Sequence, residues 1–453
     1  MTLFVDYFAP VWYLQKKSVP LTTKQTKKRD KMILPAWSQK ALLYEMNVRQ
    51  LTPTGTLRAA QRRLKGLREM GVDAIWLMPV YPIGQAGRKG SLGSYYSISD
   101  YCAINPEMGT MADFDAFVKA AHRLGMKVLL DWVANHTARD HHWVAEHPDW
   151  YEWENGEPKI PCDWTDTAKL NYENRALWQA QVEAMKFWLT EHAVDGFRCD
   201  MAMLVPTPFW NYAAEELRQV KSDLFMLCEA EQRDLTEQAF NAHYGWQMHH
   251  LMNDLAQGKC RVTALRDYLY RDREEYPATT LRLSFTSNHD ENSWSGSEFQ
   301  RMGEAHEALS LFTFVVPRAM PLIYTGQEIG YDHVFAFFDR DPIRKYTFNE
   351  HTERYAKLAR LHRENNALWG GAADWVEIHN NAEDCLLILV RETADNRVIA
   401  VMNLSPYTIQ AEYNTGIYAG EYTDFMADAP YTLPTAVSEL MAPWACRVLT
   451  QQK

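Results

Sequence analysis

Residue types that carry chemistry stand in or directly after four apolar runs of the sequence. They are Asp131, Asn135 and His136 in the first of these runs, Arg198 and Asp200 in the second, Glu229 after the third, and His289 and Asp290 after the fourth. Burying a charged side chain costs free energy unless the charge is paired. Several such residues that converge are more simply explained as a functional site than as separate structural accidents.

Asp200 and Glu229 form the most informative pair. If their runs are neighbouring strands about 4.8 Å apart, the carboxyl groups lie roughly 5–5.5 Å apart, the separation that retaining glycosidases use. In that chemistry one carboxylate attacks the anomeric carbon and the other group hands a proton to the leaving oxygen. Arg198 and Asp200 alternate along one run and face the same side, so we expect the guanidinium to keep Asp200 ionised. Glu229, which lacks such a partner, is then expected to be the acid.

The apolar runs themselves have the pattern of parallel strands buried on both faces. They begin at Leu42, Ala74, Lys127, Gly196, Leu224, Leu281 and Pro321, with a weaker run over His243–Met248. Amphipathic segments over 56–72 and 111–126, closed by Gly71 and Gly125, predict helices between the first strands. Eight strands that alternate with helices predict an α/β fold, a (β/α)8 TIM barrel, in which the C-terminal strand ends carry the chemistry.

Three segments depart from a bare barrel. Residues 1–33 join an apolar, aromatic start to a basic cluster, and we expect a poorly structured N-terminal extension there. Residues 34–368 are expected to form the catalytic barrel, with a small inserted subdomain after the third strand at about 136–171, a stretch rich in Trp, Pro, Asp and His. Short alternating runs then predict an antiparallel C-terminal β-domain, a β-sandwich over 369–453.

Composition excludes several classes of protein. The 453 residues are 47% hydrophobic and 23% charged, as in a globular protein with a large core. The net charge of −11 argues against nucleic acid as a partner, because phosphate neutralisation needs a basic face. No apolar run reaches the ~18 residues of a transmembrane segment. The basic cluster follows the apolar start, the reverse of a secretory signal, so we expect a cytoplasmic protein; a different true N-terminus would make it periplasmic or secreted.

Seven short motifs, in order and spacing, resemble those of the α-amylase superfamily of retaining glycoside hydrolases, glycoside hydrolase family 13. They are YYSISDYCAINPEMGT (95–110), DWVANH (131–136), DTAKLN (166–171), GFRCD (196–200), CEA (228–230), FTSNHD (285–290) and AMPLIYTGQEIG (319–330). Each motif is weak alone, but together they are specific and cover about residues 36–368. The C-terminal β-domain agrees with the plan of the same family.

The resemblance implies a role for each matching residue. Asp200 would be the nucleophile, Glu229 the general acid/base, and Asp290 the third carboxylate, which holds sugar hydroxyls. The residues that it implies for substrate binding are Tyr96, Asp131, His136, Arg198 and His289. Glu231 faces the same side of its strand as Glu229 and is the alternative acid; Glu229 is preferred because it directly follows the apolar run FMLC.

Calcium is the one metal that the resemblance raises. Asn135 is a calcium ligand in many relatives, and the family often has a Lys-His pair after the nucleophile, whose histidine carbonyl helps to bind the ion. This chain has Met203-Leu204 there. Calcium needs 6–8 oxygen ligands, which the sequence alone does not assemble. Calcium at Asn135 therefore stays open, and no cofactor is required.

The resulting expectation is a retaining hydrolase of α-1,4-glucosidic bonds in starch-derived maltodextrins, with an α-glucan oligosaccharide or polysaccharide as its partner. A transglycosylase, or a member specific for α-1,6 bonds or short oligosaccharides, is the first alternative, because one catalytic set serves all of these. A catalytically silent sugar-binding barrel is the second.

Overall fold

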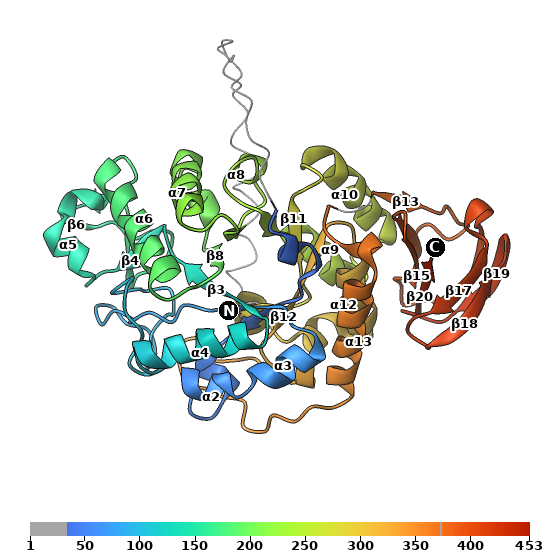
Figure 1. The fold of residues 1–453 in the computed structure, drawn as a ribbon, viewed down its shortest axis with the longest axis horizontal. Helices are drawn as coiled ribbons and strands as arrows, with labels where there is room; N and C mark the ends of the chain where they lie inside the picture. The colour runs from blue at the N-terminus through green and yellow to red at the C-terminus, as the bar shows by residue number, and fades with distance from the viewer. Residues whose placement is uncertain (1–33, 372–373) are drawn as a thin grey trace, which may run out of the picture. The chain divides into compact units, whose positions relative to one another are not determined.

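Eight parallel strands form a closed barrel in the computed structural model, which describes residues 34–371 and 374–453 (Figure 1). Around the barrel they follow the order β1-β12-β11-β10-β9-β8-β3-β2. Their bounds are β1 Leu43–Met46, β2 Ala74–Leu77, β3 Lys127–Trp132, β8 Gly196–Cys199, β9 Phe225–Cys228, β10 Ala242–Tyr244, β11 Leu281–Ser284 and β12 Ala319–Tyr324. The predicted barrel is confirmed, whereas the extension expected over 1–33 lies outside the described residues.

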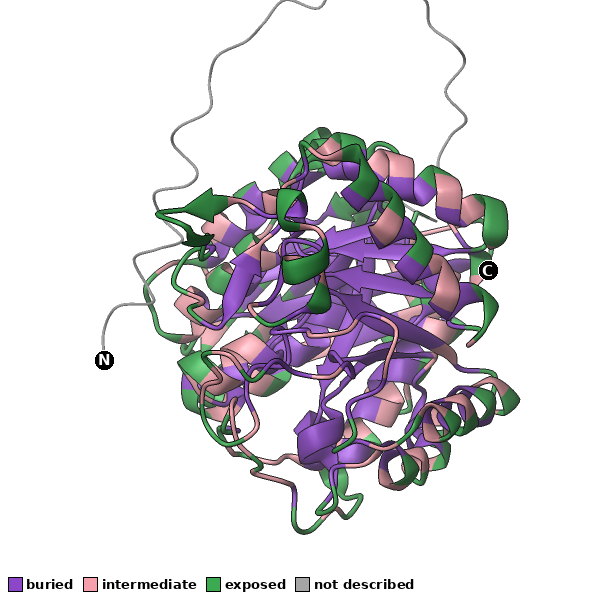
Figure 2. Ribbon diagram, turned by 90° about the vertical axis from the view of Figure 1, so that its left-hand side faces the viewer, coloured by how far each residue is buried: buried purple, intermediate pink, exposed green. Residues whose placement is uncertain are grey.

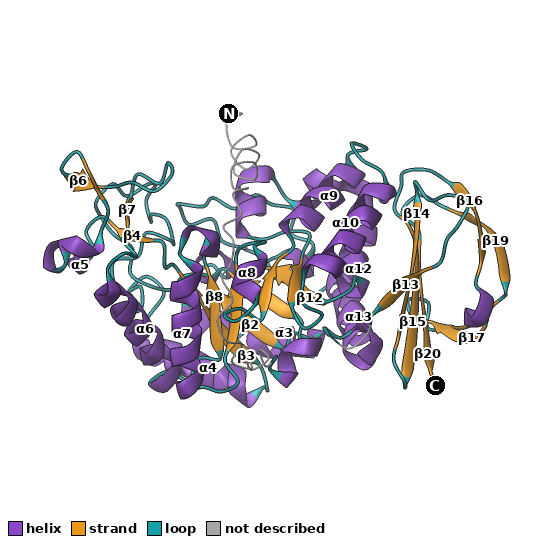
Figure 3. Ribbon diagram, turned by 90° about the horizontal axis from the view of Figure 1, so that it is seen from above, coloured by secondary structure: helices purple, strands orange, loops and turns teal. Residues whose placement is uncertain are grey.

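Helices follow the strands along the chain and surround the barrel (Figure 3). They are α1 Val48–Leu51, α2 Leu57–Gln61, α3 Leu64–Met70, α4 Met111–Arg123, α6 Arg175–Thr190, α7 Thr207–Val220, α8 Arg233–Thr236, α9 Trp246–Ala256, α10 Val262–Glu275, α11 Glu298–Met302, α12 His306–Val315 and α13 Glu350–Glu364. Among the described residues, none of the helices combines the length and the apolar character that crossing a membrane requires.

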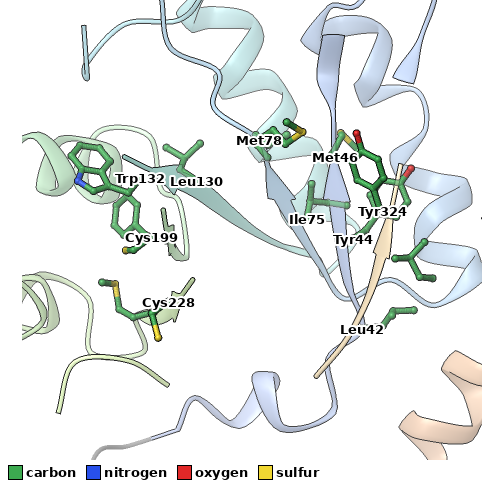
Figure 4. Packing of buried hydrophobic residues seen from close by; sticks show 14 of the residues in the cluster. Leu42, Tyr44, Met46, Ile75, Met78, Leu130, Trp132, Cys199, Cys228 and Tyr324 are labelled. Atoms are coloured by element: carbon green, nitrogen blue, oxygen red, sulfur yellow. The ribbon is translucent and has the colours of Figure 1, made fainter. Parts of the chain in front are cut away.

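Strand side chains alternate between the barrel interior and the layer under the helices, as the two-residue period of a strand requires. The interior is filled by an apolar layer that includes Leu43, Trp76, Leu129, Leu227 and Leu283. The alternate positions, among them Tyr44, Ile75, Leu130 and Cys228, pack outward into the larger core beneath the helices (Figure 4). The strands are buried on both faces, which explains their near-continuous apolar sequences and their uniform burial in Figure 2.

Polar residues take over the interior positions just beyond the apolar layer. Glu45, Asp131 and Glu229 each stand two residues beyond an apolar interior residue of the same strand. The register pairs Asp131 with Arg198 on the neighbouring strand. The fold therefore forms a layer of charged side chains at the C-terminal end of the barrel.

Two expected elements differ from the structure. The single helix expected over 56–72 is two helices, α2 and α3, with a break at Arg62–Arg63; Gly71, at a φ of +122°, ends the second. The prediction of a weak strand over His243–Met248 is also wrong for its C-terminal residues. Strand β10 covers Ala242–Tyr244, and α9 begins at Trp246 because its buried residues follow a helical period.

The inserted segment after β3 contains two short two-stranded sheets, β4-β7 and β5-β6. Its elements are β4 His136–Ala138, α5 His142–Glu146, β5 Trp153–Glu154, β6 Glu157–Pro158 and β7 Thr167–Lys169. Strand β4 pairs antiparallel with β7, so His136 lies opposite Lys169. The segment packs through rings: those of Trp143 and Trp150 lie 5.0 Å apart, and that of His147 stacks on Trp150 at 3.9 Å.

The C-terminal part is an antiparallel β-domain, as predicted. Its strands are β13 Trp375–Glu377, β14 Leu386–Glu392, β15 Asn396–Asn403, β16 Ile409–Asn414, β17 Gly420–Asp424, β18 Ala429–Leu433, β19 Ala436–Met441 and β20 Cys446–Gln452. A six-stranded sheet, β13-β14-β15-β20-β17-β18, and the pair β16-β19 enclose a separate apolar core. Strands β13, β18 and β19 were not predicted, because they are short or carry a mixture of exposed and half-buried residues.

Candidate active site

The guanidinium of Arg198 lies at the centre of the charged layer and is fully buried. Its Nη1 donates to Asp131 Oδ1 at 2.9 Å and to Asp200 Oδ1 at 3.0 Å. Its Nη2 forms an ion pair with Glu229 Oε2 at 2.8 Å, and its Nε donates to the hydroxyl of Tyr244 at 3.1 Å. The Arg198 guanidinium thus contacts three carboxylates, which come from three adjacent strand ends.

Glu229 is held on this cluster by the turn that follows Asp200. Met201 has the left-handed backbone conformation, with φ 40° and ψ 44°, which residues with a side chain adopt at a cost. In this conformation the Met201 amide N–H donates to Glu229 Oε2 at 2.9 Å. The strained turn therefore links the backbone after Asp200 to the Glu229 carboxyl group.

Glu231 lies apart from the cluster. Both of its carboxylate oxygens accept from the backbone N–H of Gln247 in the first turn of α9, at 3.1 and 3.2 Å. Burial raises the pKa of Glu231 to about 7. The structure thus gives the two glutamates different partners and brings only Glu229 to Arg198, so the expectation that Glu229 lacks a cationic partner is wrong.

A second chain of contacts joins Tyr96, His289 and Glu45. The Tyr96 hydroxyl donates to Asp131 Oδ2 at 3.1 Å and lies 2.7 Å from His289 Nε2. The two rings stack at 5.4 Å with an angle of 22°. On its other side, His289 Nδ1 is hydrogen-bonded to Glu45 Oε1 at 2.5 Å, and Asp290 Oδ2 lies 3.3 Å from Nε2. These contacts fix the histidine ring at the floor of the site.

The cluster binds protons more tightly than separate carboxyl groups would. Burial raises the pKa of Asp131, Asp200 and Asp290, and the neighbouring carboxylates add to the effect at Asp200 and Asp290. We expected Arg198 to hold Asp200 ionised; it does act in that direction, but burial outweighs it. The side chain of Asp290 is 37% exposed, and burial raises its pKa to about 6.

His136 and Asn135 lie at the edge of the cluster, under the inserted segment. Asn135 Nδ2 donates to His136 Nδ1 at 3.2 Å, and the imidazole ring tilts against Trp164 at 5.1 Å. Burial, with the Lys169 ammonium as the second cause, lowers the pKa of His136 to about 3. This histidine is therefore neutral, and the nitrogen that does not face Asn135 carries its proton.

The residues around Asn135 do not fit a calcium ion. The Lys169 Nζ donates to Asn135 Oδ1 and, at 3.3 Å, to the carbonyl oxygen of Leu204. These oxygens stand where the resemblance would place ligands, but a cation of the chain itself occupies the space between them. Over residues 34–371 and 374–453, no group of three or more His, Cys, Asp or Glu side chains is arranged to hold a metal.

A line of aromatic rings leads outward from Tyr96. Its ring is nearly parallel to that of Phe337, at 6.4 Å and 13°. Phe337 in turn contacts Trp294, at 5.3 Å, and Trp294 contacts Phe338. Trp294 belongs to a π-helical turn, Glu291–Ser295, directly after Asp290, and it is 49% exposed. We call Phe337, Phe338 and Trp294 the aromatic arm; flat rings of this kind can stack on sugar faces.

Sequence reasoning missed three residues of the site. Glu45 contacts His289, Trp76 Nε1 donates to Asp131 Oδ2 at 3.1 Å, and Tyr244 accepts from Arg198. Glu45 was detectable, because it is the one charged residue in the apolar run LLYEMNV. Trp76 and Tyr244 gave no such signal, since Trp and Tyr are as common in a hydrophobic core as in a binding site.

The fold and the site together define a class: a (β/α)8-barrel protein with a segment inserted after β3 and a carboxylate cluster at the C-terminal strand ends. The chain belongs to the α-amylase family. The family model described as "Alpha amylase, catalytic domain" matches residues 25–169 and 150–398.

Individual relatives agree with this assignment. The chain is 28% identical over 422 residues to α-amylase MalA of Haloarcula japonica, and 26% identical over 456 residues to an α-1,4-glucan:maltose-1-phosphate maltosyltransferase of Salinibacter ruber. Each match covers 88% of this chain but only 61% and 65% of the respective relative, so the chain spans less than two thirds of their length. The crystal structure of the maltogenic α-amylase AmyB of Thermotoga neapolitana superimposes with a TM-score of 0.84 at 27% identity, covering 92% of this chain and 99% of AmyB.

Replacing Glu45 tests the contact with His289. Gln can donate or accept at this position and so keeps the hydrogen bond to Nδ1, whereas Leu cannot. We expect Glu45→Leu to lower kcat/KM on a maltodextrin about 10- to 100-fold, through misplacement of the imidazole. Glu45→Gln should stay near the wild-type value, and the thermal midpoint Tm of both variants should show that they fold. Equal kcat/KM values for the two variants would contradict this account of the contact.

Proposed function

We propose that the chain is a retaining glycoside hydrolase that cleaves α-1,4-glucosidic bonds in starch-derived maltodextrins. The observation that carries the proposal is the contact of Asp200 and Glu229 with the two terminal nitrogens of one buried guanidinium, at neighbouring strand ends. A separation of roughly 5–5.5 Å between the two carboxyl groups, which a retaining mechanism needs, is part of the proposal. Residues 34–368 would form the catalytic domain and residues 369–453 the C-terminal domain.

In the first step, an Asp200 oxygen attacks the anomeric carbon while Glu229 hands its proton to the glycosidic oxygen. The C–O bond to the leaving sugar breaks, and a covalent glycosyl–Asp200 ester forms. Arg198 holds both carboxyl groups in place through Nη1 and Nη2.

In the second step, Glu229 takes a proton from a water molecule, whose oxygen attacks the same carbon and releases Asp200. The remaining residues of the site bind the sugar that is being cleaved. Tyr96 would provide its stacking platform, the proton-bearing nitrogen of His136 would donate to a hydroxyl, and His289 and Asp290 would hold further hydroxyls. Asp131 acts through Arg198 and stays out of contact with the bond.

Transfer to a sugar acceptor in place of water is the second candidate function. It is favoured by one observation, the similarity to a relative named as a maltosyltransferase. Both reactions share the covalent ester and differ only in what attacks it. Incubation with maltoheptaose separates them: hydrolysis gives only shorter products, and products longer than maltoheptaose would show transfer.

Substituting each carboxyl group tests the assignment of roles. Asp200→Asn should lower the release of reducing sugar from maltoheptaose by about 10³-fold or more, because no ester can form. Glu229→Gln should slow this cleavage about 10²- to 10⁴-fold, yet leave much of the activity on an aryl maltoside whose leaving group needs no proton. Asp163→Asn, an exposed site in the inserted segment, is the matched control and should be neutral.

Glu231→Gln separates the two candidate acids. Because Glu231 contacts the start of α9, this variant should show the same ratio of maltoheptaose to aryl maltoside activity as the wild type. If Glu231→Gln showed the leaving-group dependence and Glu229→Gln lost both activities equally, the acid would be Glu231.

The aromatic arm is expected to bind sugar units beyond the cleavage point. Trp294→Ala should raise KM for maltoheptaose about tenfold, the equivalent of a lost contact worth ~1.4 kcal/mol, and should change KM for an aryl glucoside little. Tyr407→Ala, which removes a 64% exposed ring from the C-terminal domain, serves as the control. A Trp294→Ala enzyme with equal effects on the long and the short substrate would contradict this role.

A further inference from the structure

We propose that the Lys169 ammonium is a built-in cation that takes the place of a calcium ion and positions the loop after Asp200 against the strand end that carries Asn135. Lys169 is thus a positioning residue, and its effect on catalysis rests on the proposed function. Its effect on stability and on metal binding does not.

The contacts of the ammonium join three separate segments. Lys169 is the last residue of β7 in the inserted segment, Asn135 follows β3, and Leu204 ends the turn after β8. Nζ donates to the side-chain oxygen of Asn135 and to the backbone carbonyl of Leu204. The Asn135 oxygen is aimed at the lysine because the amide nitrogen of the same side chain donates to His136.

The ammonium leaves no room for a metal at the same oxygens. Calcium requires oxygen atoms at 2.3–2.6 Å, and Nζ already stands at hydrogen-bonding range of both candidate ligands. A divalent ion there would be repelled by the adjacent positive charge. In the described part of the chain, no carboxylate lies within ion-pair distance of Nζ, and Glu152, whose charge acts on Lys169, is paired with Lys159 at 2.7 Å.

The position of these contacts relates them to catalysis. The turn from Met201 to Leu204 begins with the amide that donates to Glu229 and ends at the carbonyl that Lys169 holds. The same turn donates once more, from the Ala202 N–H to the Glu229 carbonyl, at 3.2 Å. Lys169 also lines a cavity of about 650 Å³ between the inserted segment and this turn. Loss of the ammonium is therefore expected to loosen the donor that holds Glu229.

The test uses the full chain and three readouts: Tm, calcium content and kinetics. For the wild type we expect the same Tm in a chelator and in millimolar calcium, and no calcium retained after purification. Lys169→Met, which keeps the apolar stem and removes the charge, should lower Tm and should reduce kcat on maltoheptaose about tenfold with a smaller change in KM. Its kcat on an aryl maltoside, whose leaving group needs no proton from Glu229, should change less. Lys65→Met, which removes an exposed ammonium paired with Glu69 on α3, is the matched control and should match the wild type.

A second variant tests the equivalence of the two cations directly. Lys169→Asp replaces the ammonium with a carboxylate beside two neutral oxygens, and its Tm should rise with calcium while that of Lys169→Met does not. Three outcomes would each overturn the proposal. They are one calcium retained per wild-type chain, a wild-type Tm that falls on chelation, and a Lys169→Asp Tm that does not change with calcium. A Lys169→Met enzyme with wild-type Tm and kcat would overturn it as well. A wild-type chain without activity on any α-glucan would sink the proposed function, while Tm and calcium content would still decide this inference.

Discussion

One buried guanidinium organises the site. Arg198 forms ion pairs with Asp131, Asp200 and Glu229, and the hydroxyl of Tyr244 accepts from its Nε–H. Removing one partner of such a buried set leaves an uncompensated charge and lowers the free energy of unfolding by several kcal/mol. The carboxylates keep the pKa of Arg198 above its ordinary value despite its burial, so the cation persists. The two carboxyl groups proposed for catalysis are therefore held in place before any substrate arrives.

The barrel makes this arrangement possible because it closes. Parallel strands in register bring Asp131 beside Arg198, and the neighbouring strand β9 adds Glu229 two residues beyond interior Leu227. The apolar layer below excludes water, and the loops above supply what the strands cannot: the Met201 amide, the Tyr96 hydroxyl and the aromatic arm. Charged side chains that would destabilise an apolar core are tolerated at the C-terminal end of the barrel, because each of them has a partner there.

Much of this could be predicted from the sequence, for physical reasons. The alternation of Arg198 and Asp200 fixed their common face, and the apolar runs located the strands. Strand β10 was misplaced because three residues give too short a period, and β18 and β19 were missed because they face solvent on one side. Glu45 was overlooked although it interrupts an apolar run. The place of Lys169 depends on how an inserted segment folds back onto β4, a long-range contact that no local pattern contains.

The central claim is that Asp200 forms a covalent bond to the sugar while Arg198 holds it beside Glu229. Treating the wild-type chain with a fluorinated maltosyl fluoride slows the second step and lets the ester accumulate, and mass spectrometry of a proteolytic digest then locates the adduct. The account predicts one maltosyl adduct per chain, on the peptide that contains Asp200, and none in Asp200→Asn. An adduct on the peptide of Glu229 or Asp290, or turnover without any adduct, would contradict it.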